Sequence, residues 1–239
     1  YGAGNLVVAV AGSLDHDAVL EEVRRRFEDL ESGPERMSVT VPQANGARAI
    51  HLGREGSQTH LVVGGAAPTH GDPRRHAVVL LSQALGGGMS SRLFQRVREE
   101  LGLAYSVDSF HAVHQVAGVL GVSLGTRPGA LKEAVAVIRA EMASMAREGL
   151  PGDELQRARA QVQGQLTLAL ESTGARLHRL AGSALRGEPL LSLDELLARY
   201  EAVTADEVAV VAEELLDPEA LTTVSLGPDP TGDVSGVIE

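Results

Sequence analysis

The stretch from Leu85 to Val107, LGGGMSSRLFQRVREELGLAYSV, places three consecutive glycines before a pattern typical of a helix and then of a strand. Glycine allows a tight backbone path, and the amides at the start of the following helix are exposed. Ser90 is a candidate cap for a helix that runs from Ser91 to Glu100, and Gly102 ends it. The stretch therefore predicts a corner where two helices meet, after which the chain enters a sheet.

Upstream of this corner, the pattern predicts two short strands and one helix. The strands are Ala49–Leu52 and Thr59–Gly65, which are short apolar runs between turn residues. A helix begins after Pro73 and is expected to direct four residues toward the core: His76, Val79, Leu80 and Ala84. The triple glycine ends this helix.

Downstream of the corner, the sequence predicts a hairpin of Ala104–Val113 with Val116–Leu124. Two apolar stripes then predict two long antiparallel helices, and the members are Leu131, Ala134, Val135, Ile138, Met142 and Met145 in the first and Leu155, Ala158, Val162, Leu166, Ala169 and Leu170 in the second. Further helices begin at Ser192 and Thr204, each with a glutamate three residues later in the spacing of a capping box. A strand at Leu221–Leu226 closes the domain.

The N-terminal region has a strand and helix pattern of its own. Asn5–Gly12, NLVVAVAG, is a continuous apolar run typical of a buried strand, and a helix with cap candidates Ser13 and Asp15 follows it. This run parallels ALTTVSLG near the C-terminus, which suggests an internal repeat of two α+β domains. We therefore expect four parts: 1–32 as the tail of a first, mostly absent domain, 33–46 as a linker, 47–230 as a complete second domain and 231–239 as a tail.

Composition and charge exclude several classes of function. The formal charge of −11 argues against a nucleic-acid or anionic-membrane surface, because either would require clustered lysine and arginine. The absence of cysteine excludes disulfides, thiolate nucleophiles and cysteine-ligated metals. No apolar run approaches the roughly 20 residues that span a bilayer, and the first residues lack the basic region of a secretory signal. The sequence therefore indicates a soluble, cytoplasmic protein.

The glycine-rich corner has three interpretations from residue type alone. A phosphate-binding loop would need a strand before it and a Lys-Ser or Lys-Thr pair inside it, whereas here a helix precedes and the pair is absent. The second interpretation is a helix corner in which glycine permits close packing. The third is an anion site formed by the exposed amides at the start of the following helix.

Arg98 and Tyr105 are the candidate chemical groups beside this corner. Arg98 lies in the last turn of the predicted helix and Tyr105 at the start of the predicted strand, so the turn at Gly102 can hold both at one end of the sheet. A guanidinium and a phenol can hydrogen-bond a peptide carbonyl and the oxyanion formed from it, worth about 3 kcal/mol per donor. The alternatives are a helix-end cation favoured by the macrodipole and an ordinary half-buried strand aromatic.

The whole Leu85–Val107 stretch resembles the C-terminal half of pitrilysin/insulysin-type metallopeptidases, the inverzincins. Members of that family carry a glycine-rich corner, an SRLF-like helix start, and an arginine and a tyrosine separated as Arg98 and Tyr105 are. Weaker similarity, in LPGDELQRARAQVQGQL and TGARL, is closest to compact bacterial members similar to mitochondrial processing peptidase. The resemblance implies an α+β metallopeptidase-half domain, processing-peptidase-like, with a mixed antiparallel sheet and helices packed on one face.

This resemblance also implies a zinc-dependent endopeptidase whose metal lies elsewhere. In the family a first half supplies an inverted zinc motif, H-x-x-E-H, and this sequence has no such motif. The pair His111 and His114 falls in a predicted strand, where the two side chains point to opposite faces, so we assign no metal ligand and expect no cofactor in this chain. Zinc is expected in the missing N-terminal half.

The implied site is a substrate-facing wall. Arg98 and Tyr105 are the auxiliary catalytic residues, which stabilise substrate and transition state, and five residues line the substrate site: Gly86, Gly87, Gly88, Met89 and Ser90. The expected partners are the zinc-bearing N-terminal half, on the same polypeptide or a separate one, a peptide substrate and further copies of the chain, with no nucleic acid and no membrane. Two other functions stay open: a non-catalytic scaffold or assembly subunit of the same fold, and a nucleotide binder.

Overall fold

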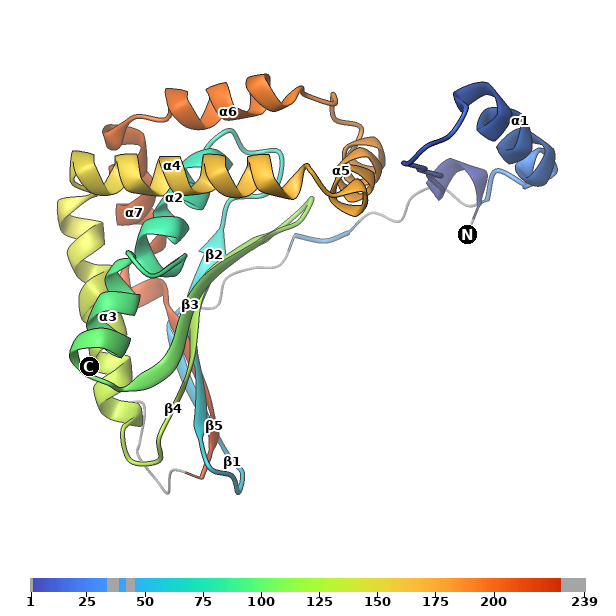
Figure 1. The fold of residues 1–239 in the computed structure, drawn as a ribbon. Helices are drawn as coiled ribbons and strands as arrows, with labels where there is room; N and C mark the ends of the chain where they lie inside the picture. Colours follow the sequence, from blue (N-terminus) through green and yellow to red (C-terminus); the bar gives the residue numbers. More distant parts are fainter. Residues whose placement is uncertain (1, 34–38, 42–45, 229–239) are drawn as a thin grey trace. The chain divides into compact units, whose positions relative to one another are not determined.

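A computed structural model describes residues 2–33, 39–41 and 46–228 of the chain (Figure 1). Internal contacts divide the chain into two units. The sheet unit comprises Val41–Val162 and Arg199–Glu239, and the helical unit comprises Tyr1–Thr40 and Gln163–Ala198. The Leu85–Val107 stretch lies wholly within the sheet unit.

The sheet unit contains five strands in the order β1-β5-β2-β4-β3. Their bounds are Arg48–Gly53 (β1), Thr59–Ala67 (β2), Ala104–Val113 (β3), Gly118–Thr126 (β4) and Thr222–Gly227 (β5). β1 and β5 run parallel, and the other neighbours are antiparallel, so the sheet is mixed. Within this unit, the predicted strands and the predicted hairpin are confirmed, with boundaries shifted by at most two residues.

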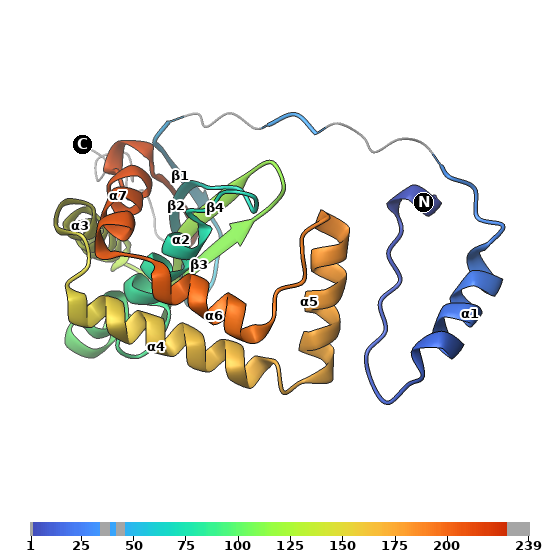
Figure 2. The same cartoon turned by 90° about the horizontal axis from the view of Figure 1, so that it is seen from above.

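Helices cover one face of this sheet (Figures 1 and 2). The covering elements are α2 (Arg75–Gly86), the π-helical segment η2 (Phe94–Glu100), α3 (Leu131–Glu148) and α7 (Ala205–Leu215). The apolar stripe predicted for α3 is buried throughout. Burial of one such side chain, for example Ile138, contributes about 1.5–3 kcal/mol to folding. The α+β class with helices on one face is therefore confirmed.

Among the described residues of the sheet unit, no helix covers the opposite face of the sheet (Figure 1). Strand register places one row of residues across this open face, and the row is Ile50, Val224, Val62, Ser123 and Asp108. Ile50 and Val62 are exposed large apolar residues. The open face is thus a partly apolar surface that ends at the edge strand β3.

Local capping fixes where the later helices begin. The α7 N-cap Thr204 accepts a hydrogen bond from the Glu207 amide at 3.2 Å, and the Glu207 carboxylate accepts one from the Thr204 amide at 2.7 Å. Ser192 and Glu195 make the same reciprocal pair at the start of α6 (Leu193–Ala202). Each cap typically contributes about 1 kcal/mol, and both predicted capping boxes are confirmed.

The expectation of two long antiparallel helices is wrong in its geometry. Both helices exist, as α3 and α4 (Gly152–Ala169), but α4 turns away from α3 instead of running back beside it (Figures 1 and 2). Gly149, with a φ of 67°, and Pro151 set the corner. The apolar face of α3 packs on the sheet and on α7, so its burial does not require packing along α4.

The helical unit differs most from the expectations. Its elements are η1 (Ala3–Asn5), α1 (His16–Phe27), the C-terminal part of α4, α5 (Thr173–Arg186) and the first part of α6. Asn5–Gly12 forms no strand, because no neighbouring strand is present to pair with it in the described chain. The helix at α1 is confirmed, with Asp15 as its cap, whereas α5 was not expected from the sequence.

Three further observations complete the fold. The predicted linker at 33–46 and tail at 231–239 lie largely outside the described residues. The short 3₁₀ segment η3 (Pro218–Ala220) leads into β5. Within the described part of the chain, no helix combines the length and the apolar character needed to cross a bilayer.

Candidate functional site

The glycine turn, defined as Gly86–Ser90, connects α2 to η2 and packs tightly against its surroundings. A side-chain carbon added at Gly86 would lie 2.6 Å from the backbone nitrogen of Ser109 on β3. The Ser109 hydroxyl lies 3.0 Å from the Ser82 hydroxyl of α2, which fastens the end of α2 to the edge strand. Only glycine permits this approach of helix to strand.

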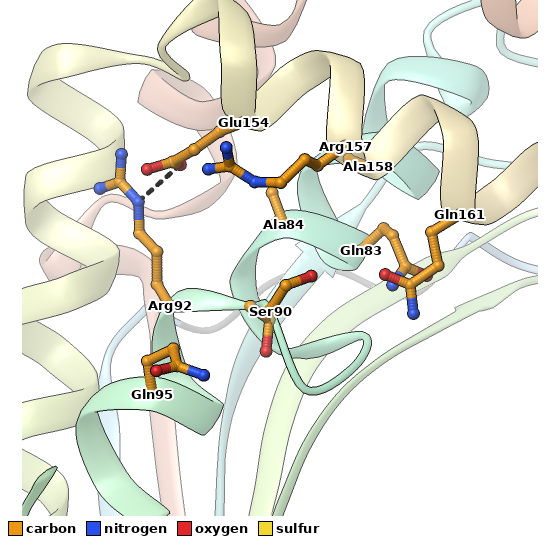
Figure 3. A pocket seen from close by; sticks show the side chains of 10 residues that line it. Gln83, Ala84, Ser90, Arg92, Gln95, Glu154, Arg157, Ala158 and Gln161 are labelled. Atoms are coloured by element: carbon orange, nitrogen blue, oxygen red, sulfur yellow. Dashed lines mark hydrogen bonds and ion pairs between the residues drawn. The ribbon is translucent and has the colours of Figure 1, made fainter. Parts of the chain in front are cut away.

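Two glutamine side chains hold the middle of the glycine turn. The Gln83 side-chain amide donates to the Gly87 carbonyl at 2.7 Å, and the Gln161 amide, from α4, donates to the same oxygen at 3.4 Å. Figure 3 shows the two amide groups side by side. A side-chain carbon at Gly87 would overlap Gln83, and one at Gly88 would overlap Gln161.

Two further carbonyls of the glycine turn, those of Gly88 and Met89, also accept hydrogen bonds. The Gly88 carbonyl accepts hydrogen bonds from the Ser91 amide at 3.0 Å and the Ser91 hydroxyl at 2.6 Å. The Met89 carbonyl accepts one from the Gln95 amide at 2.6 Å. The turn follows a helix and not a strand, so it lacks the setting of a phosphate loop, as expected.

Arg98 lies in the last turn of η2, where the helix widens. The Leu101 amide donates to the Arg96 carbonyl five residues back, at 3.2 Å, which is π-helical spacing. The Arg98 guanidinium lies 4.8 Å from the Phe94 ring centre and 4.7 Å from the Tyr105 ring centre. Its remaining ion pair, with Glu99, is long at 3.6 Å.

Tyr105 is presented to solvent by an irregularity in β3. The register between β3 and β4 shifts between Ala104 and Val107, so Tyr105 and Ser106 are both exposed in the bulge. The Tyr105 side chain is 79% exposed. Its hydroxyl has no hydrogen-bond partner among the described residues, whereas its ring is covered on one face by Arg98. The two predicted catalytic residues therefore do lie together.

The glycine turn and Tyr105 line different cavities. A depression of about 410 Å³ on the open sheet face is lined by Tyr105, Ser106, Asp108 and His60 among others. A second cavity of about 270 Å³ lies between the glycine turn and α4 (Figure 3), and its lining includes Ser90 of the turn. No residue belongs to both linings. Ser90 of the glycine turn and Tyr105 therefore line separate cavities, and the single substrate-facing wall expected from the sequence stays a prediction.

Charges around the second cavity are paired. Arg92 forms an ion pair with Glu154 at 2.9 Å, which connects the residues just before η2 to α4 (Figure 3). Arg157 bonds to Asp153 at 2.6 Å, and this hydrogen bond holds the pKa of the Asp153 carboxyl below its usual value. The cavity thus combines amides with balanced charges.

The histidines and carboxylates do not assemble a metal site. Among the described residues, no group of three or more His, Cys, Asp or Glu side chains could hold a metal ion. His111 lies in β3 and His114 immediately after it. The residues of this part of the chain therefore do not fit a zinc ion, and no chemical step can be assigned to zinc held by them.

Three residues that the sequence did not single out contribute to the geometry. Phe94 stacks on Arg98, and the four-residue spacing of the two along one helix was an available signal. Gln83 and Gln161 converge on one carbonyl from helices 78 residues apart in sequence, a coincidence that only the fold produces. Their role follows from tertiary packing.

Comparisons with known proteins show which family the chain resembles. The sequence profile described as peptidase M16 inactive domain matches residues 1–162. An uncharacterized zinc protease of Streptomyces coelicolor is 40% identical over 225 residues, which cover 90% of this chain and 49% of that protein. An uncharacterized zinc protease of Bacillus subtilis is 31% identical, with 94% of this chain and 55% of that protein covered. The chain therefore spans about half the length of these curated relatives.

Solved structures give the same result. A peptidase M16 inactive domain from Pseudomonas fluorescens matches with a TM-score of 0.88 and 26% identity, over 97% of this chain and 55% of that chain. A protease from Helicobacter pylori matches with a TM-score of 0.79 and 22% identity, over 91% of this chain and 54% of that one. At 22% identity the second likeness concerns the fold alone.

Proposed function

The chain belongs to the peptidase M16 family as an inactive domain, and from this premise we propose that it is the C-terminal, substrate-binding half of a zinc-dependent endopeptidase. The peptide would lie enclosed between this half and a zinc-bearing half. The zinc and the general base would both come from that partner, because the described residues of this chain do not fit the metal.

The observation that supports the proposal most is the Tyr105 hydroxyl. It is exposed on the open sheet face and unpartnered among the described residues, and the Arg98 guanidinium lies over its ring at 4.7 Å. In this role Tyr105 donates a hydrogen bond to the oxyanion of the reacting carbonyl. Arg98 orients the Tyr105 ring and contacts the substrate backbone. The glycine turn at Gly86–Ser90 supplies a neighbouring part of the substrate wall.

The need for a partner half is supported by length and by unburied apolar residues. The curated relatives are about twice as long as this chain. Leu6, Val8 and Val10 alternate along an extended segment and are 40–48% exposed, which is the pattern of a strand without a sheet. We assign this segment and α1, within 1–32, to the first domain, with 33–46 as linker and 47–230 as the second domain.

Reconstitution tests the proposed function. The chain alone should bind zinc with low stoichiometry and leave an internally quenched peptide uncut, because it lacks a metal-ligating cluster among its described residues. Mixing it with a zinc-bearing first half of a family member should produce cleavage that a chelator abolishes. A first half whose motif glutamate is changed to glutamine is the matched control and should stay inactive.

Two results would contradict the proposal. One is stoichiometric zinc or peptide cleavage in the untagged chain alone. The other is a mixture in which the two halves associate, as judged by sedimentation, but no peptide is cleaved with zinc present. The second result would favour the scaffold alternative, because a scaffold requires association and not turnover.

A further inference from the structure

We propose that Gln161 on α4 is a positioning residue that, together with Gln83, fixes the glycine turn in its substrate-facing conformation. The proposal rests on the proposed function for its link to substrate. It concerns a helix that enters no part of the predicted site. Gln161 belongs to the sheet unit, as do the glycine turn and Gln83.

The first argument is the convergence of two donors on one acceptor. Gln83 donates to the Gly87 carbonyl at 2.7 Å and Gln161 donates to the same oxygen at 3.4 Å. A carbonyl oxygen has two lone pairs, so both bonds can form at once. The Gly87 peptide plane is therefore held from its own helix and from α4, and its rotation would break both bonds.

The second argument is steric. The position of a side chain at Gly88 is filled by the Gln161 amide, and that at Gly86 by the Ser109 backbone. Each of these glycines thus faces a different element: β3 for Gly86 and α4 for Gly88. Triple glycine is usually taken as a flexible segment because it has many accessible conformations. Here the missing side chains are replaced by neighbouring groups, which leaves the turn little room to move.

The third argument is a second tie to the same helix. Arg92, just after the glycine turn, bonds to Glu154 of α4 at 2.9 Å, and both side chains are largely buried. Gln161 lies two turns further along α4, so the helix contacts the turn region at both ends of the cavity (Figure 3). The first turns of α4 therefore act as a brace for the glycine turn.

Amide exchange of the chain tests the contact without any need for catalysis. The informative amides are the backbone amides of Gly87 and Ser91. The Gly87 amide donates to the backbone carbonyl of Gln83 and the Ser91 amide to that of Gly88, each at 3.0 Å. In Gln161→Ala both should exchange on the order of five- to tenfold faster, because the brace is removed while α2 and η2 remain. Gln161→Glu should do the same, since it keeps the shape and loses the donor. Gln165→Ala, an exposed glutamine on the same helix, is the control and should leave exchange unchanged.

A double variant sharpens this test. Gly88→Ala should displace the Gln161 amide and so reproduce the faster exchange of Gln161→Ala. Because the two changes remove one contact, the double variant should exchange no faster than either single variant. Two results would overturn the proposed contact. One is a Gln161→Ala variant whose amides exchange no faster than those of the unaltered chain, and the other is a double variant in which the two single effects multiply.

Kinetics of the reconstituted peptidase test the link to substrate. Gln161→Ala should raise KM several-fold with kcat within twofold, because a loosened wall weakens substrate binding more than it affects the reacting groups. Gln161→Glu should not restore KM, and Gln165→Ala should match the unaltered protein. Faster exchange with an unchanged KM would overturn the positioning role. If the unaltered chain mixed with the zinc-bearing half cleaves no peptide, that result would instead count against the proposed function. The exchange experiment would still decide whether Gln161 contacts the glycine turn.

Discussion

The glycine turn and the Arg98–Tyr105 stack come from one short stretch of sequence and are built in opposite ways. In the turn, the carbonyls of Gly87, Gly88 and Met89 all accept hydrogen bonds from neighbouring residues. At the stack, the Tyr105 hydroxyl is exposed and unpartnered among the described residues. Carbonyls that already accept hydrogen bonds within the chain stabilise the conformation of the turn. A hydroxyl donor that is exposed and unpartnered is available to bind a ligand. The contrast separates the residues that shape a wall from those that act on what lies against it.

The largest effect on stability is expected on the turn side of this contrast. Gly86→Ala should lower the free energy of unfolding by about 1–3 kcal/mol, because the new carbon meets the Ser109 backbone and the strand must shift. Urea unfolding followed by circular dichroism measures the change. Gly152→Ala, at a site with nothing within 4 Å, is the control and should stay within about 0.5 kcal/mol. Equal stabilities of the two variants would break the claim that the turn is packed.

Buried His76 extends the contrast to a titratable group. Burial lowers the pKa of His76, and the charges of Arg75 and Arg199 lower it further. A hydrogen bond to the Pro73 carbonyl raises this pKa but does not offset the lowering. The His76 side chain therefore binds a proton more readily in the unfolded chain, where its pKa is about 6.5, than in the folded chain. The stability that neutral His76 contributes is present above pH 6.5 or so and is lost as pH falls below it.

Removal of the proton site measures that contribution. His76→Phe keeps an aromatic edge against Tyr200, whose ring centre lies 5.1 Å away, and cannot be protonated. Between pH 7 and 5 its free energy of unfolding should fall less steeply than that of the unaltered protein, by at most about 1.4 kcal/mol per pH unit. Parallel stability curves from urea titrations over this range would contradict the account of His76.

The smallest effect on stability is expected at the stack. Tyr105→Ala and Arg98→Ala should each cost about 0.5–1 kcal/mol, the usual range of an exposed cation–π contact. Since both remove the same contact, a double-mutant cycle should give a coupling energy of similar size. Destabilisation above about 2 kcal/mol by Tyr105→Ala would mean that this tyrosine is structural, and the contrast with the turn would fail.

Local sequence signals predicted the sheet unit well. The stripe of α3, the hairpin of β3 with β4 and the capping box at Thr204 and Glu207 each depend on residues close in sequence, and all are confirmed. The nearness of Arg98 and Tyr105 was predictable for the same reason, since a single turn joins the helix and the strand that carry them.

Features set by distant partners could not be predicted in this way. Asn5–Gly12 has the composition of a buried strand, but a strand needs a neighbour, and the described chain offers none. The bulge that exposes Tyr105 depends on β4 register, and the brace from Gln161 depends on the path of α4. No local pattern indicates that Ser90 of the glycine turn and Tyr105 line separate cavities.

The hydroxyl of Tyr105 provides the most direct test of the account. In the reconstituted peptidase, Tyr105→Phe should lower peptide turnover on the order of a hundredfold, with unchanged unfolding, because it removes only the proposed oxyanion donor. Ser106→Ala removes a neighbouring hydroxyl from the same bulge and should leave turnover unchanged. A Tyr105→Phe rate equal to that of the unaltered protein would contradict the account and leave the chain as a scaffold.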